Sequence, residues 1–290
     1  MPKSKGAALL RIFRPTDRDI EFLKAKFGIH PIILHELKTA TARARVERYE
    51  NYLFFVYYFP LYDPKHATTL RTEIDFIVTH HAVIAVHNEK IEALDSLPEI
   101  NAEGSLKLLY DVLQALIEFQ ERQLRHVREK VEGVGKELFK NKEKEVLERV
   151  SYLKRDISEY RIIVRLEQAA LQSLLHRGMK FWTKDAEIYL NDLIGDHLRI
   201  VNQVENYREA VNDFEDTNNQ LMSLKINTVM KTFTILSFLT FPFVLTAAIL
   251  TIPARGTPII DLPGSFWIIA ALMAAGMSAL VLYFKRKGWF

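Results

Sequence analysis

Amide and carboxylate side chains recur at every third or fourth position between residues 202 and 227. At this spacing they share one face of an α-helix, and their oxygen atoms suit hard divalent cations such as Mg²⁺. The stripe comprises Asn202, Asn206, Glu209, Asp213, Asp216, Gln220, Ser223 and Asn227. In a symmetric bundle it would line an axial funnel that concentrates cations, although every amphipathic helix has a polar face.

The same steps of three and four residues continue into an apolar segment, residues 232–252, which has no charged side chain. A helix of that length spans about 30 Å, the thickness of a bilayer's hydrocarbon core. The continued stripe is Met230, Thr234, Ser237, Phe241, Val244 and Ala248. Hydroxyl groups at lipid depth favour a water-lined path. The opposite face should pack against other helices, and it carries Val201, Val204, Val211, Phe214, Leu221 and Leu224.

A second uncharged segment covers residues 266–284, so the chain is expected to cross a membrane twice. Buried helices of a soluble core rarely lack charge for so long. The intervening external loop, residues 253–265, holds only Arg255 and Asp261 as charged residues, whereas the tail, residues 285–290, is basic. By the positive-inside rule both termini face the cytoplasm, which predicts a multi-pass protein of the cell (inner) membrane. Two helices cannot enclose a pore, so any conducting form must be an oligomer.

The part of the chain before the spans reads as two regions. Residues 1–100 mix β-rich runs with short helices and predict a cytoplasmic α/β domain. Residues 101–231 predict a cytoplasmic helical hairpin and a stalk helix. The expected strands are 8–13, 52–62, 72–80 and 82–88, and the expected helices are 17–28, 30–39, 106–139, 144–176 and one that runs from about 184 into the membrane. The fold class is therefore an α+β membrane protein.

Composition excludes several classes of protein. The chain has no cysteine, which removes disulfide scaffolds, thiolate zinc sites and cysteine nucleophiles. Its net charge of +3 and its alternating charges in the hairpin do not describe a nucleic-acid binder. It contains no glycine-rich phosphate loop, nucleophile elbow or metalloprotease helix motif, so we expect no enzyme and no covalent cofactor.

Four stretches of the sequence together resemble the CorA family of magnesium transporters over essentially the whole chain. They are HPIILHELKTATARARVERYENYLFFVYYF, IDFIVTHHAVIAVH, INTVMKTFTILSFLTFPFVLTAAI and YFKRKGWF. The resemblance implies a homopentamer with a cytoplasmic α/β funnel and five copies of the first span around a pore. Positions of this chain that match pore-lining positions are Asn227, Met230, Thr234, Ser237, Phe241 and Val244.

The outer end of the first span departs from the family pattern. The family has Gly-Met-Asn there, and the ring of these residues binds hydrated magnesium. Alignment without a gap places Thr251, Ile252 and Pro253 at this position. Proline offers no side-chain oxygen, and a nearby ring of Arg255 would repel cations. Deeper in the span, Phe233 and Phe241 replace smaller residues of familiar members and could form a tight hydrophobic constriction.

The resemblance also implies a regulatory divalent-cation site between protomers, which maps to Glu36 and Asp192. Two facing carboxylates repel each other until a divalent ion bridges them. His35 stands where the family has an acid, and an imidazole beside a carboxylate would better suit zinc, although a surface histidine often has no ligand.

Three functions remain open from the sequence. The first is a homopentameric channel that moves divalent cations, with Mg²⁺ the leading ion. The second keeps the fold and moves zinc or another transition metal. The third is a non-conducting membrane scaffold or divalent-cation sensor. In each case the partners are the lipid bilayer and further copies of the chain, without nucleic acid.

Overall fold

The computed structural model describes residues 6–39, 44–63, 68–98, 102–182, 185–252 and 263–288. The chain divides into two compact units, Met1–Asp216 and Thr217–Phe290.

The first unit is built on a mixed five-stranded sheet in the order β1-β5-β4-β3-β2. Its strands are β1 (Ala8–Phe13), β2 (Val46–Arg48), β3 (Tyr52–Asp63), β4 (Thr68–Thr79) and β5 (Ala82–His87). β1 pairs with β5 in parallel, and the other neighbours are antiparallel. The four predicted strands are confirmed. The short, charged β2 was not predicted.

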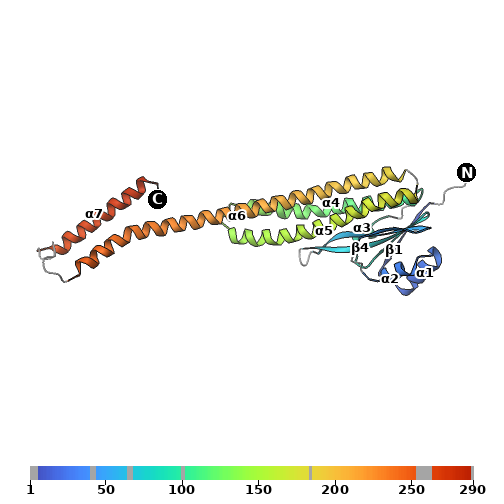
Figure 1. Ribbon diagram of the computed structural model, residues 1–290, viewed down its shortest axis with the longest axis horizontal. Coiled ribbons are helices and arrows are strands. Elements are labelled where there is room, and N and C mark those ends of the chain that lie inside the picture. Colours follow the sequence, from blue (N-terminus) through green and yellow to red (C-terminus); the bar gives the residue numbers. More distant parts are fainter. Residues whose placement is uncertain are drawn as a thin grey trace. The chain divides into compact units, whose positions relative to one another are not determined.

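Helices cover both faces of this sheet (Figure 1). α1 (Asp17–Phe27) and α2 (Pro31–Glu36) bury Leu23 and Ile33 in one hydrophobic core with Phe54 and Val56 of β3. Thr16 caps α1, because its hydroxyl accepts from the Asp19 amide in a capping box.

The opposite face of the sheet packs against α4 (Ser105–Glu137) and α5 (Glu143–Phe181). A short helix, α3 (Glu92–Asp95), precedes them. The predicted long helices are confirmed, and α5 continues past residue 176 to Phe181. His80 stacks on Phe181 with ring centroids 4.4 Å apart, and Arg48 donates to the Lys180 carbonyl at 2.9 Å. These contacts with the sheet hold the added turn.

α6 (Ala186–Leu250) begins in the first unit and continues into the second, which also contains α7 (Ser265–Arg286). Both helices carry an apolar window long enough to cross a membrane, and at most 6% of either window is buried. A core helix of a soluble protein would bury most of such a window. The apolar exposure therefore agrees with the two predicted spans. Within this unit Gly276 of α7 leaves room for Phe243 of α6, since an added Cβ would come within 3.4 Å of its ring.

Candidate functional site

The polar stripe of α6 is exposed throughout the first unit. Its members there, Asn202, Asn206, Glu209, Asp213 and Asp216, all have exposed side chains. The opposite face packs as predicted: Val204 and Val211 are buried, and the ring of Phe214 lies against Gly135 of α4, where an added Cβ would come within 3.1 Å. Helical periodicity therefore turns the acidic side chains away from the core.

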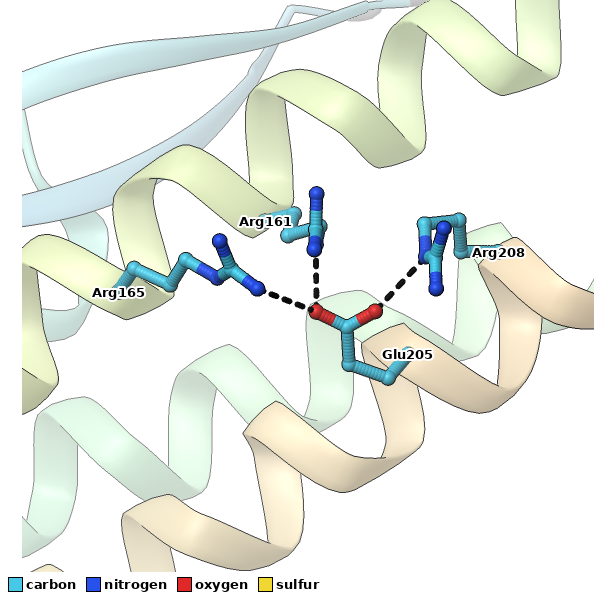
Figure 2. Close-up of polar contacts among 4 residues, drawn as sticks. All are labelled: Arg161, Arg165, Glu205 and Arg208. Atoms are coloured by element: carbon cyan, nitrogen blue, oxygen red, sulfur yellow. Dashed lines mark hydrogen bonds and ion pairs between the residues drawn. The ribbon is translucent and has the colours of Figure 1, made fainter.

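Glu205 is one of the carboxylates that join α6 to α5. Glu205 accepts from Arg161 Nε at 2.5 Å and Arg165 Nη2 at 3.3 Å, both on α5, and from Arg208 Nε at 2.8 Å on α6 itself (Figure 2). The hydrogen bond from Arg161, followed by that from Arg208, lowers the pKa of Glu205 against an opposing effect of burial. With Glu205 held against α5, its neighbour Asn206 points away from the packed face.

We expect Glu205→Gln to destabilise the first unit by about 1 kcal/mol at neutral pH, because the ion pairs are partly exposed. The folded-state pKa of Glu205 lies below the unfolded value of about 4.3. The stabilisation is therefore present above that value and is lost as the pH falls through the folded-state pKa. Thermal unfolding of wild type and variant at several pH values measures this. Glu209→Gln, on the exposed stripe, is the matched control, and an equal shift in both variants would contradict the prediction.

In the second unit the stripe continues with Gln220, Ser223 and Asn227, all exposed. Beyond them Met230, Phe233, Thr234, Ser237, Phe241, Val244 and Ala248 are exposed as well. Leu224, expected on the packing face, is 62% exposed, whereas Ile235 further along α6 is buried. The predicted pore positions thus form one continuous, uncovered face of the helix.

Threonine hydroxyl groups of this segment donate to carbonyl groups of their own helix. Thr234 donates to the Met230 carbonyl at 2.8 Å, and Thr240, off the stripe, donates to the Leu236 carbonyl at 2.9 Å. Such bonds satisfy a hydroxyl in lipid without water. The Thr234 hydroxyl alone therefore does not distinguish a water-lined face from a lipid-facing one.

Two of the three residues at the selectivity position belong to the described chain. Thr251 follows α6, and its hydroxyl donates to the Ala248 carbonyl at 2.7 Å, whereas the Ile252 side chain is exposed. Pro253 lies outside the described residues, as does Arg255.

Each carboxylate of the predicted regulatory pair has a partner within the chain. Glu36, at the end of α2, forms an ion pair with Arg45, and Asp192 on α6 accepts from the Tyr110 hydroxyl at 2.6 Å. The hydrogen bond to Asp192, more than burial, raises the pKa of Tyr110 to about 12. His35 is exposed. Over the described ranges no group of three or more His, Asp or Glu side chains is arranged to hold a metal within one chain.

Sequence reasoning missed a buried polar cluster between the sheet and the helices. Glu167 Oε2 of α5 accepts from Gln120 Nε2 of α4 at 2.9 Å and lies 2.8 Å from His197 Nε2 of α6. Tyr160 donates to the Gln120 carbonyl at 3.1 Å. The sequence did contain a signal for this position. Glu167 lies three or four residues along α5 from pairs of apolar residues that are buried, so helical spacing places it on the same face.

Comparison with known proteins agrees with this architecture. A family model described as CorA-like Mg²⁺ transporter protein matches residues 4–286. The cobalt/magnesium transport protein CorA of Thermotoga maritima is 26% identical over 271 residues, which cover 91% of this chain and 77% of the relative. The protein of the same name from Methanocaldococcus jannaschii is 23% identical over 286 residues, or 96% of this chain and 89% of the relative.

Solved structures show the same fold. The complete structure of the CorA magnesium transporter from Methanocaldococcus jannaschii superposes with a TM-score of 0.86 at 23% identity, covering 97% of this chain and 91% of that one. The full-length CmaX protein gives a TM-score of 0.73 at 16% identity, covering 97% and 88%. The matched fold has an N-terminal α/β domain, a long stalk helix and two C-terminal apolar helices, and the chain belongs to the CorA-like Mg²⁺ transporter family, which comprises membrane transporters and not enzymes.

Proposed function

We propose that this protein is a homopentameric channel that moves divalent cations, with Mg²⁺ the leading ion, through a pore lined by α6. The observation that carries the proposal is the exposed stripe from Asn202 to Ala248, which is polar and acidic first and then small or apolar. Five such stripes around an axis would attract cations at one end and pass them along the spans. Two relatives, of which the match covers 77% and 89%, are named cobalt/magnesium transport proteins.

The topology follows from the same features. Both termini lie in the cytoplasm, the spans cross the cell (inner) membrane, and the partners are lipid and four further copies of the chain. Lys285 and Arg286, in the last turn of α7, support this orientation by the positive-inside rule.

The outer selectivity position is Thr251, Ile252 and Pro253 in place of Gly-Met-Asn. The water ligands of hydrated Mg²⁺ donate hydrogen bonds and need acceptor oxygens, and the proline at the third position has no side-chain oxygen to accept them. We therefore expect weaker retention of hydrated Mg²⁺ at this mouth than in relatives with the tripeptide.

Regulation would take place between protomers, where Glu36 of one copy faces Asp192 of the next and a divalent ion bridges them. Zinc or another transition metal is the second candidate ion, and the observation that favours it is the exposed His35 beside Glu36.

Metal-resolved uptake by the purified protein in proteoliposomes tests the proposal. We expect Mg²⁺ uptake that Asn227→Ala lowers at least about tenfold, since a loss of 1.4 kcal/mol at the pore entrance is tenfold in rate. Thr228→Ala is the matched control, because Thr228 is the next residue and its hydroxyl bonds to the Leu224 carbonyl. Uptake of zinc alone would select the second ion. Absence of uptake for every ion and gradient would refute transport.

A further inference from the structure

Arg45 is held among acidic side chains where α2 meets the sheet. Its Nη2 pairs with Glu36 Oε2, its Nε lies 3.3 Å from Glu47 Oε1, and its guanidinium carbon lies 5.4 Å from the centroid of the Phe54 ring. The side chain is only 20% exposed. The low exposure and the contact with the Phe54 ring distinguish this ion pair from an ordinary exposed ion pair on the surface.

A buried acid lies in the same cluster. Asp75 of β4 is 4% exposed, and its Oδ1 has no hydrogen-bond partner. Burial, and then the charges of Glu73 and Glu36, raise the pKa of Asp75 well above its usual value, whereas Arg45 opposes the rise. Glu36 and Glu47 are two carboxylates beside the one guanidinium of Arg45, so an added cation would be attracted to the cluster.

Glu36 is also the carboxylate that we assign to the regulatory divalent-cation site. A guanidinium and a divalent ion both bind the lone pairs of the carboxylate oxygens, so the two compete for Glu36. Arg45 is tethered nine residues from Glu36 and never loses its charge, which gives it a high and constant local concentration.

We propose that Arg45 is a built-in competitor that occupies Glu36 when divalent cations are scarce and thereby sets the concentration at which they bind. This inference rests on the proposed regulatory role of Glu36. Binding of a divalent ion would release the guanidinium from Glu36, while Glu47 and the face of Phe54 would retain it nearby.

Mg²⁺ binding to the full-length protein, measured by calorimetry and by the Mg²⁺-dependent rise in melting temperature, tests the competition. Arg45→Gln should lower the Mg²⁺ concentration for half-saturation about fivefold, the scale of a partly exposed ion pair. Arg48→Gln removes the same charge three residues further along the chain, but Arg48 contacts the Lys180 carbonyl. Equal shifts in Arg45→Gln and Arg48→Gln would overturn the proposal, because a general change of charge would explain both.

Two further variants separate this inference from the proposed function. Glu36→Gln should weaken Mg²⁺ binding; if it has no effect, the regulatory site and the competition both fail. If Glu36→Gln weakens binding and Arg45→Gln leaves half-saturation unchanged, only the competition fails. Arg45→Lys keeps a charge without the planar fork, and we expect it to lie between wild type and Arg45→Gln. The melting temperature without Mg²⁺ shows whether each variant is folded.

Discussion

Glu167→Ala should destabilise the first unit by about 3–5 kcal/mol, because it opens a cavity and leaves buried polar partners unsatisfied, each at a cost of about 1–3 kcal/mol. Glu167 is fully buried and His197 is 1% exposed, so water cannot replace the lost carboxylate. Two donors, Gln120 Nε2 and His197 Nε2, meet at the same oxygen of Glu167. Both would be left in the core without it.

The expected loss is large because four elements meet at this carboxylate. Gln120 lies on α4, His197 lies on α6, and Glu167 itself belongs to α5. Tyr57 of β3 is the fourth contributor: burial, and next the charge of Glu167, raise the pKa of Tyr57 well above its usual value. A cavity at Glu167 would therefore weaken the attachment of the stalk helix to the hairpin and of the hairpin to the sheet.

Denaturant unfolding of the full-length protein in detergent, followed by circular dichroism, measures the change. Glu159→Ala is the matched control, because Glu159 is an exposed acid on the same helix and should change stability by less than about 0.5 kcal/mol. The double variant Glu167→Met/His197→Leu should recover much of the loss, since apolar groups of similar volume leave no unpaired charge. A loss below about 1 kcal/mol in Glu167→Ala would show that the cluster contributes little.

This cluster also shows where sequence reasoning stops. The sequence analysis assigned no role to Glu167, yet Glu167 has the helical phase of Ile163, Val164 and Leu171, which are buried. Periodicity could have placed Glu167 in the core. The partner could not have been found, because His197 is 30 residues away and meets Glu167 only through the packing of α6 on α5.

In the rest of the fold, too, the sequence predicted which segments are buried but not which distant residues meet. Alternating or continuous apolar runs revealed β1, β3, β4 and β5, because burial in a sheet leaves a pattern in the sequence. β2 has three residues and a buried valine, and its pairing with β3 creates it. That pairing also places Arg45 beside Glu36, so the ion pair at the candidate regulatory site was invisible in the sequence, whereas the helical stripe followed from spacing alone.

Replacing both Phe233 and Phe241 by alanine should raise cation flux at least about tenfold at low cytoplasmic Mg²⁺, if the rings close the pore. Both rings lie on the uncovered face of α6, with exposures of 63% and 66%. In a pentamer they would form two rings of aromatic side chains about 12 Å apart along the axis. A narrow apolar constriction blocks ions because it loses its water, and alanine would widen it.

Flux in proteoliposomes that contain a Mg²⁺-sensitive dye separates the channel from the scaffold. Phe238→Ala is the control, since Phe238 is 60% exposed but is not one of the positions assigned to the pore. Flux that rises in the double variant and not in the control would place the closed gate at the phenylalanines, whatever the wild-type rate. If neither variant conducts and the wild-type protein binds Mg²⁺ through Glu36, the protein is a membrane sensor. That function would account for a chain that has the acidic stripe and the regulatory carboxylates but has Thr251, Ile252 and Pro253 at the selectivity position.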